Sequence, residues 1–502
     1  MNVLVRVDAR LRVDVRELSE DCIADLKAEF VHKNPQHAKL KSLKLPTWKE
    51  PPVIRTWTGG PGTLNLPRGG TASLREVLKK HGHGITWKDE RTSPHVVPSL
   101  LPPHNVELRP YQAPCVDAAI VMENCIVRSP TGSGKTTVAM ALAQKLGVPV
   151  LVIVMSGELL DQWVQRAQTE LGLSARDIGV IRAGKLKLKP LTIAMQQTLA
   201  KLDDDDQKAI GSYFGAVICD EVHKFAARTF TEVIDWMPAR YRIGMSADET
   251  RKDRKEFLIY DLFGAVAAEI KKEDLIAASF VVDVEVRAME SGAQASWYRA
   301  EHDNKLFMRL LDQLANDDAR NGKIADLAAR EVALGHQVLI FSHRRDHCAR
   351  LASHLAIRKV KSKCMLGGAE DSAELKEALA GLRDGSLRAA VGTIQAIGTG
   401  IDIPTINRGI LATPIVSNRQ LFGQVTGRLC RSSKGKSEAV LYVMHDSEAF
   451  GDYPLRNFQK WATMCTWEDE LGGIITLDEH LADGAPDSDD GPIFDELEKM
   501  LA

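Results

Sequence analysis

The stretch Arg128-Ser129-Pro130-Thr131-Gly132-Ser133-Gly134-Lys135-Thr136-Thr137 decides the fold of this chain. It follows the apolar run Cys125-Ile126-Val127 and leads into the helix-forming run 138–143. A strand, a glycine-rich turn and a helix in this order are typical of a phosphate-binding loop. The glycines let backbone N–H groups approach a polyphosphate, and the start of the helix adds a favourable dipole.

Two side chains of this stretch have the chemistry that a nucleotide needs. We expect Lys135 to reach the β- and γ-phosphates and Thr136 to place its hydroxyl on Mg²⁺. Ser129 replaces the first glycine of the general pattern, so the match depends mainly on the Gly-Lys-Thr part. Taken alone, the stretch also fits a simple turn before a surface helix.

Length and composition limit the classes of protein to which this chain could belong. The 502 residues are enough for about three domains, and 44% hydrophobic with 26% charged residues is ordinary for a globular protein. The net charge of −2 means that any nucleic-acid surface must be a local patch. The eight cysteines are scattered, which favours buried free thiols in a reducing compartment over a zinc site. Without a long apolar run or a signal pattern, we expect a cytoplasmic protein of a bacterial or phage-infected cell.

The first 105 residues read as a small α+β accessory module that we expect to bind nucleic acid. Between residues 33 and 91, twelve lysines and arginines face only four acidic residues, with Trp48, Trp57 and Trp87 interleaved. Basic residues bind phosphates and aromatic rings stack on bases. A solvated basic face with tryptophans in the core is the alternative. Prolines near residue 100 then indicate a linker.

The rest of the chain alternates strand and helix patterns. This alternation predicts doubly wound parallel sheets, and therefore an α/β fold with two such units. We expect the first unit at 106–268, a connecting segment at 269–320, the second unit at 321–470, and an acidic flexible tail with a short helix at 471–502. The acidic run 203–206 is expected to be a solvated loop or helix start and not a metal site.

An apolar strand at 217–219 ends in two carboxylates, Asp220 and Glu221. At the carboxyl end of a parallel strand, they are expected beside the phosphate loop. Asp220 can hold Mg²⁺, and Glu221 can orient and deprotonate an attacking water. An Asp-Glu pair is a weak signal alone, but together with the phosphate loop it predicts nucleotide hydrolysis.

With these motifs in order, residues 106–465 resemble the superfamily 2 helicases of the DEAD/DEAH-box-like group, which includes type III restriction motors and phage and repair helicases. The resemblance implies two tandem RecA-like lobes, with ATP and Mg²⁺ as cofactors. In the first lobe it implies that the nucleotide is bound by Gln112, which reads adenine, and by Thr131, Gly132, Ser133, Gly134, Lys135, Thr136 and Thr137. Ser156 in motif Ia, and Gln197 and Thr198 in motif Ib, are implied contacts to nucleic-acid phosphates.

The second lobe carries the remaining motifs of the resemblance. Residues 424–431 match the pattern Q-x-x-G-R-x-x-R, which implies that Arg428 and Arg431 act as arginine fingers and that Gln424 helps to position water. Such cations stabilise charge on the transferred phosphoryl group. In motif V, the resemblance implies that Gly400 and Asp402 contact the nucleotide and that Thr393 contacts nucleic acid.

Each of these roles has a structural alternative. Arg428 and Arg431 could be charges on a helix surface, Ser156 and Thr198 ordinary caps, Thr393 a strand-end hydroxyl and Gln112 a surface side chain.

The chain departs from the family pattern after residue 246. Asp248 and Glu249 stand where relatives have threonine and often proline. An extra carboxylate near the γ-phosphate would be repelled unless Arg251 or Lys252 paired with it. The departure lies in residues 244–248, which resemble motif III of the family. It affects the coupling role usually given to that motif and not ATP binding.

Together, these features predict an ATP-dependent helicase or translocase that unwinds DNA or moves branches in it. The expected partner is single-stranded, forked or branched DNA, with RNA less favoured, no membrane, and possible nuclease or recombination proteins. The alternatives are a motor subunit serving a separate nuclease in a restriction or defence complex, a nucleotide-gated DNA clamp suggested by Asp248, and an RNA helicase.

Overall fold

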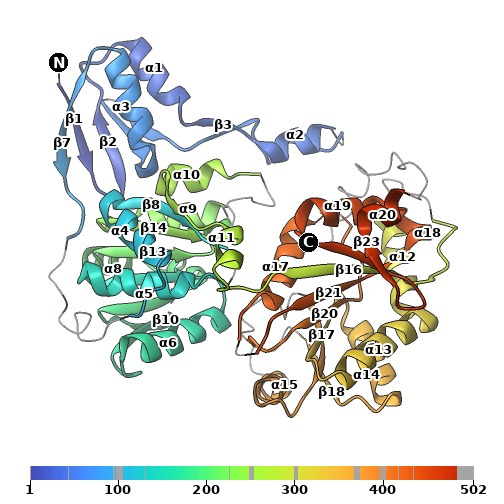
Figure 1. Ribbon diagram of the computed structural model, residues 1–502. Coiled ribbons are helices and arrows are strands. Elements are labelled where there is room, and N and C mark those ends of the chain that lie inside the picture. The colour runs from blue at the N-terminus through green and yellow to red at the C-terminus, as the bar shows by residue number, and fades with distance from the viewer. Residues whose placement is uncertain are drawn as a thin grey trace. The chain divides into compact units, whose positions relative to one another are not determined.

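The computed structural model describes residues 2–42, 44–60, 62–93, 97, 106–130, 132–224, 227–247, 254–298, 304–366, 373–394, 396, 403–416, 418–433 and 435–482. The chain folds as two compact units, Met1–Lys271 and Lys272–Ala502. The first unit contains an N-terminal domain and a large parallel sheet, and the second contains another large parallel sheet (Figure 1).

The N-terminal domain is a five-stranded mixed sheet with helices packed on it. The strand order is β5-β6-β2-β1-β7, with bounds β1 Asn2–Val7, β2 Arg10–Asp14, β5 Thr58–Gly60, β6 Thr63–Pro67 and β7 Gly84–Asp89. Its helices are α1 (Glu20–Ala28), capped by Ser19, and α3 (Thr71–Lys80). Alternate residues such as Val3, Val5, Leu11 and Val13 are buried, which is the period-two pattern of a sheet with one covered face.

The sheet of the first unit has eight strands, in the order β11-β10-β12-β9-β13-β14-β8-β15. Their bounds are β8 Asn124–Arg128, β9 Val150–Val154, β10 Ile178–Arg182, β11 Lys185–Lys187, β12 Leu191–Met195, β13 Ala216–Asp220, β14 Tyr241–Ser246 and β15 Val266–Glu269. All neighbours pair in parallel except β11 with β10. The central strands are buried throughout, as expected for a sheet covered on both faces.

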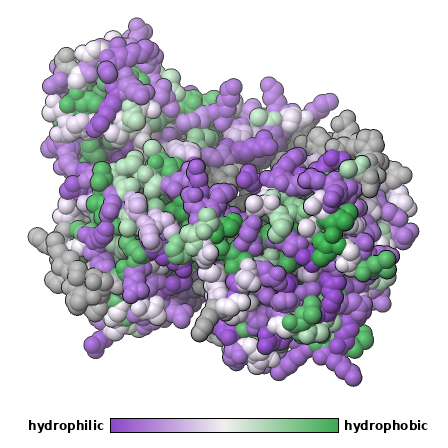
Figure 2. All heavy atoms as spheres, in the orientation of Figure 1, coloured by the Kyte–Doolittle hydropathy of each residue, from purple (hydrophilic) through white to green (hydrophobic). Residues whose placement is uncertain are grey.

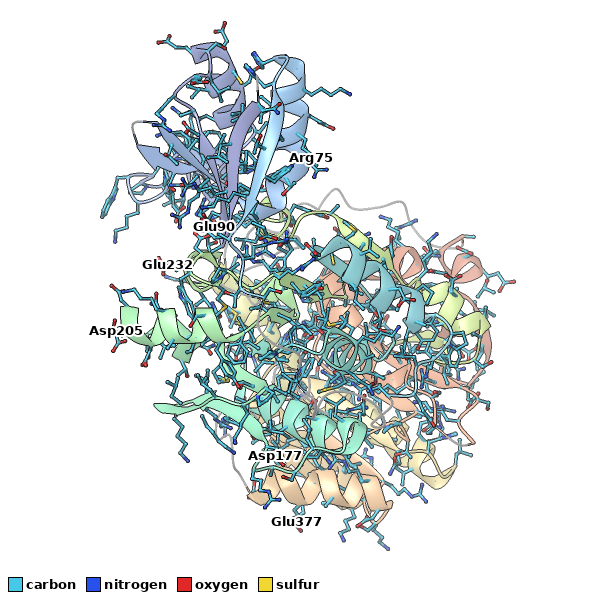
Figure 3. The ribbon with its side chains drawn as sticks, turned by 90° about the vertical axis from the view of Figure 1, so that its left-hand side faces the viewer. Arg75, Glu90, Asp177, Asp205, Glu232 and Glu377 are labelled. Carbon is cyan, nitrogen blue, oxygen red and sulfur yellow. The ribbon has the colours of Figure 1, made fainter. Side chains whose placement is uncertain are left out.

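Helices connect these strands, as the parallel pairing requires. They are α4 (Gln112–Met122), α5 (Lys135–Leu146), α6 (Gly157–Leu171), α7 (Gln196–Leu199), α8 (Asp204–Tyr213), α9 (Ala227–Asp235) and α10 (Phe257–Phe263). The acidic run 203–206 begins α8, where Asp203 caps the helix by accepting from the Asp206 amide. Asp205 points outward from this helix (Figure 3).

Two buried guanidinium groups fasten the N-terminal domain to this sheet. Arg68, 2% exposed, donates to Asn124 Oδ1 at 3.0 Å and to the carbonyls of Ala239 and Arg240 at 2.6 and 2.8 Å. From the sheet, Arg242 donates to the Ala9 carbonyl at 2.9 Å. Burial lowers the pKa of Arg242 to about 10. Because buried charges without such partners are costly, these contacts make the N-terminal domain a fixed part of the first unit.

The second unit is built on another eight-stranded sheet, in the order β18-β19-β17-β20-β21-β16-β22-β23. The bounds are β16 Val284–Glu290, β17 Val338–Ser342, β18 Ser362–Met365, β19 Ala389–Thr393, β20 Arg408–Leu411, β21 Ala439–His445, β22 Cys465–Glu468 and β23 Ile474–Thr476. Only β23 pairs antiparallel. The α/β fold with two parallel sheets and a small N-terminal α+β domain is therefore confirmed.

Helices pack against the sheet of the second unit. They are α11 (Lys272–Ala277), α12 (Asn304–Asn316), α13 (Asp318–Ala333), α14 (Arg345–Ile357), α15 (Ala373–Asp384), α17 (Arg419–Leu429), α18 (Ser447–Phe450), α19 (Tyr453–Trp461) and α20 (Leu477–Ala482). β16 comes from the expected connecting segment, and β23 and α20 come from the expected tail. The five-segment division of the chain stays a prediction.

The eight cysteines are free thiols. Across the described residues, the longest and most apolar helices still fall short of what crossing a lipid bilayer requires.

Candidate active site

The phosphate loop lies between β8 and α5, where the sequence places it. Gly132 and Gly134 have φ values of +88° and +82°, in the left-handed region that favours glycine. A Cβ atom on Gly134 would also lie 2.5 Å from Gln112 Nε2. The loop therefore needs glycine at Gly134 for both its backbone conformation and its space.

Lys135 connects this loop to the acidic pair. Its Nζ lies 3.2 Å from Glu221 Oε1 and 3.2 Å from the Ser129 carbonyl. The side chains of Lys135 and Glu221 are 10% and 17% exposed, so solvent screens their attraction only partly. The two residues belong to different elements and come together because β8 and β13 end at the same edge of the sheet.

Glu221 has an unusual backbone. Its φ is +53°, which few residues other than glycine adopt. This conformation lets the chain turn directly after β13 and keeps the carboxylate at the sheet edge beside Lys135. Such strain is often found at functional positions.

The carboxylate of Asp220 accepts a hydrogen bond from helix α6. Trp163 of α6 donates its indole N–H to Asp220 Oδ2 at 2.9 Å, and the two residues are 2% and 6% exposed. A buried carboxylate is costly unless it is hydrogen-bonded, so this bond fixes where Asp220 points. Sequence reasoning assigned Trp163 no role; its only signal was its place at the end of motif Ia.

His223 joins the acidic pair to the neighbouring strand. Its Nδ1 lies 2.8 Å from Ser246 Oγ and 3.5 Å from Glu221 Oε2. The amide of Ser129 in turn donates to the Ser246 carbonyl at 2.8 Å. The phosphate loop and the segment after β13 are thus joined through Ser246 at the end of β14. Asp248 and Glu249 lie outside the described residues.

Gln112 is hydrogen-bonded to the backbone of the phosphate loop. It is 2% exposed, accepts from the Arg109 amide at 2.9 Å and donates to the Ser133 carbonyl at 2.8 Å. The Tyr111 hydroxyl donates to the same carbonyl at 2.9 Å. Gln112 is therefore not a surface side chain, and its contact to adenine stays a prediction.

The hydroxyls of the loop have different surroundings. Ser133 is buried and donates to the Pro130 carbonyl at 2.6 Å, which closes the loop on itself. Thr136 is half-buried in the first turn of α5. Thr137 donates to Glu170 Oε1 of α6 at 3.4 Å. Thr131 lies outside the described residues.

The candidate nucleic-acid contacts of the first unit lie at the same sheet edge. Ser156 follows β9 and caps α6, accepting from the Leu159 amide at 3.3 Å. Gln197 and Thr198 lie on α7, directly after β12, which pairs with β9. Gln197 is exposed and donates to the Met155 carbonyl at 3.1 Å. Their contact to phosphates stays a prediction.

In the second unit, Gln424 and Arg428 are four residues apart on α17 and share one helix face. Arg431 follows just after the helix, and all three are half-buried. Lys436 fastens this region by donating to the carbonyls of Pro404, Ile406 and Leu429 at 3.0, 2.6 and 2.5 Å.

Thr393, 5% exposed, ends β19 and accepts from the Ala396 amide at 3.2 Å. Gly400 and Asp402 lie outside the described residues. The roles of all these residues toward nucleotide or nucleic acid stay predictions.

The residues of the first unit fit a nucleoside triphosphate with a divalent cation. Gly134 provides space that a Cβ would fill, Lys135 brings a nearly buried ammonium, and the twelve-residue helix α5 starts at this point. In the described part of the chain, three metal-ligating side chains do not cluster anywhere. Asp220 could hold Mg²⁺ with few other protein ligands, because this ion takes one or two carboxylates and completes its shell with phosphate oxygens and water.

Comparison with known proteins agrees with this geometry. Residues 105–250 match the family described as type III restriction enzyme, res subunit, and residues 321–433 match the helicase conserved C-terminal domain. Probable helicase D10 of Escherichia phage T5 is 27% identical over 73% of this chain and 76% of its own length. The DNA 3'-5' translocase XPB2 of Sulfurisphaera tokodaii is 25% identical over 73% and 88%.

Two further proteins are similar to this chain. The putative DNA 3'-5' helicase Rad25 of Halobacterium salinarum is 27% identical over 74% of this chain, but the match spans only 59% of that protein. A fragment of a putative HsdR subunit of a type I restriction enzyme from Vibrio vulnificus has a similar fold, with a TM-score of 0.52, 18% identity, and coverage of 73% and 70% of the two chains. With both domain families present in order, the chain belongs to the superfamily 2 helicases, in the type III restriction and XPB group, and is an ATP-hydrolysing helicase.

Proposed function

We propose that this helicase uses ATP and Mg²⁺ to move on DNA and to unwind or remodel it, branch migration included. The observation that carries the proposal is the pairing of Lys135 with Glu221, 3.2 Å apart, beside an Asp220 held by Trp163. This arrangement is suited to binding and hydrolysing a triphosphate. DNA as the substrate is supported by the relatives that are named DNA helicases and translocases.

In the proposed reaction, Lys135 leaves Glu221 and binds the β- and γ-phosphates, while backbone N–H groups of the loop and Thr136 bind the rest of the polyphosphate. Asp220 would hold Mg²⁺ through the carboxylate that the Trp163 indole orients. When bound, Mg²⁺ neutralises charge on the phosphate oxygens. Glu221, released from the lysine, orients the attacking water and takes its proton. The lysine thus links nucleotide arrival to the release of the base.

The second unit is proposed to complete the reaction. Arg428 and Arg431 would stabilise charge on the γ-phosphate, and Gln424 would help to position water. Gly400 and Asp402 are proposed to contact the nucleotide. Ser156, Gln197, Thr198 and Thr393 are proposed to bind phosphates of the nucleic acid.

The N-terminal domain is proposed to recognise DNA. Arg75 lies on its surface, and its guanidinium is 5.3 Å from the centre of the Trp87 ring (Figure 3). We place the protein in the cytoplasm, with single-stranded, forked or branched DNA as the partner.

The test is steady-state ATP hydrolysis with single-stranded, duplex, forked and RNA ligands, joined to strand displacement on forked DNA. We expect DNA to stimulate turnover more than RNA does, and Lys135→Ala to abolish it. Stimulation by RNA alone would indicate an RNA helicase. Weak turnover that DNA does not raise would indicate a nucleotide-gated clamp and refute the motor.

A second candidate is a motor subunit that acts with a separate nuclease. It is favoured by the match of residues 105–250 to the res subunit of type III restriction enzymes. Co-purification from native cells followed by a cleavage assay tests it: a nuclease partner would support this candidate, and strand displacement by the chain alone would favour the first.

A further inference from the structure

A hairpin-like arm leaves the N-terminal domain between α1 and β5. It consists of β3 (Val31–Lys33), α2 (Pro35–Ser42) and β4 (Val53–Arg55), and we call residues 31–55 the basic arm. In Figure 1, β3 and α2 extend away from the five-stranded sheet. Helix α2 has no buried residue and therefore adds nothing to the hydrophobic core.

Polar contacts hold the base of the arm together. Asn34, 2% exposed, donates to the Pro51 carbonyl at 2.8 Å and to Glu50 Oε2 at 3.0 Å. His37 Nδ1 lies 2.7 Å from the Glu50 carbonyl. These bonds join the start of α2 to the segment just before β4.

The arm is also fastened to the ATP-binding part of the first unit. His32 stacks on Phe257 of α10 with ring centres 4.1 Å apart, and its Nε2 lies 2.9 Å from Asp261 Oδ2. Thr56, just after the arm, donates to the same Asp261 carboxylate. The base of the arm is therefore in direct contact with α10.

The outer part of the arm carries large apolar side chains in solvent. Trp48 is 79% exposed and Leu45 is 50% exposed. The Lys49 ammonium lies 4.6 Å from the centre of the Trp48 ring. An exposed tryptophan next to a cation is suited to stacking on a nucleobase while the cation meets a phosphate.

The arm is strongly basic. It contains Lys33, Lys39, Lys41, Lys44, Lys49 and Arg55, and its single acidic residue is Glu50, which Asn34 binds. Its net charge is thus +5, from six cations and one anion, in a chain whose net charge is −2. Hydrophilic side chains cover most of the arm on the face that Figure 2 shows.

We infer that the basic arm binds DNA at a junction between paired and unpaired strands, with the lysines on phosphates and Trp48 stacked on the exposed base pair or base. This inference rests on the proposed function and names the part of the N-terminal domain that touches the substrate. Lys39 and Lys41 are exposed on α2, so both charges are available to a polyanion. A lysine-rich arm with one exposed indole fits a polyanion with stacking surfaces.

The first experiment measures the salt dependence of binding to forked DNA by the full chain. We compare Lys39→Gln with Lys41→Gln in one variant against Lys185→Gln with Lys187→Gln, an exposed pair on β11, as the matched control. Because each neutralised phosphate contact contributes about 0.9 to the slope of log K against log salt, the arm variant should lower that slope by about 2. The control should leave it unchanged. Equal slopes in both variants would overturn the inference.

The second experiment concerns Trp48. Trp48→Ala should weaken binding to a fork roughly 5- to 100-fold and Trp48→Phe less, since stacking on a base is lost or reduced. ATP hydrolysis without DNA should stay unchanged in both, because Trp48 is 79% exposed and belongs neither to the phosphate loop nor to the acidic pair. Tryptophan fluorescence quenching by DNA should be smaller in Trp48→Phe than in the wild type.

The outcomes separate the two proposals. If the wild type unwinds forks and the arm variants bind and unwind equally well, the arm inference is wrong and the proposed function stands. If the wild type neither binds DNA nor responds to it in ATP hydrolysis, both are wrong.

Discussion

Trp163→Phe should weaken the response of ATP hydrolysis to Mg²⁺. The change removes the 2.9 Å hydrogen bond from the indole N–H to Asp220 Oδ2 and keeps an aromatic ring in the site. Trp163 is 2% exposed, so water cannot easily replace the lost donor. Asp220 then loses the partner that sets its orientation.

The size of the effect follows from this single bond. A hydrogen bond to a charged group contributes about 1.5–3 kcal/mol, and loss of the partner of a metal-binding carboxylate typically costs about 10- to 100-fold in metal affinity or activity. We therefore expect the Mg²⁺ concentration for half-maximal hydrolysis to rise roughly 10- to 100-fold. At saturating Mg²⁺, the turnover of Trp163→Phe should return close to that of the wild type.

The assay is ATP hydrolysis titrated with Mg²⁺ at fixed ATP, together with binding of a fluorescent nucleotide with and without Mg²⁺. Nucleotide binding in EDTA should be unchanged, because Lys135 and the loop are intact. Trp467→Phe, a buried tryptophan of the second unit that stacks on His480, is the matched control and should leave the titration unchanged. An unchanged Mg²⁺ midpoint in Trp163→Phe, with only a lower melting temperature, would refute the reasoning and leave Trp163 as a packing residue.

Three other predictions follow from the same structure. Lys135→Ala should abolish hydrolysis while circular dichroism stays that of the wild type; residual turnover above about 1% would contradict its role at the phosphates. Gly134→Ala should weaken nucleotide binding more than Gly423→Ala, because Gly134 has φ +82° and a crowded Cβ position, whereas a Cβ at Gly423 meets nothing within 4 Å. Burial, and next the charge of Arg320, lower the pKa of His347 to about 3, so between pH 6.5 and 3 the unfolded chain binds a proton that the folded chain does not. The free energy of unfolding should then decrease as the pH is lowered through that window, by up to about 1.4 kcal/mol per pH unit from this group. Urea unfolding of His347→Gln should show a smaller decrease over the same window. Equal pH dependence in both proteins would contradict this role of His347.

Much of the fold is readable from the sequence because it depends on local chemistry. The strand before residue 129, the glycines of the loop and the helix after Lys135 follow one another within twenty residues, and each has a backbone preference of its own. The apolar strand that ends at Asp220 is equally local. These signals were sufficient for the α/β class, the two parallel sheets and the superfamily 2 motifs.

The tertiary structure alone revealed which other side chains hold these residues in place. Trp163 and Asp220 are 57 residues apart, and Arg242 and Ala9 are 233 apart. No periodicity in the chain encodes such pairs, because strand order and the packing of α6 bring them together. The positive φ of Glu221 and the exposure of Trp48 also depend on surroundings that composition does not describe. Local chemistry thus determines the nucleotide loop, whereas long-range packing determines how its carboxylates are held and which side chains remain for the nucleic acid.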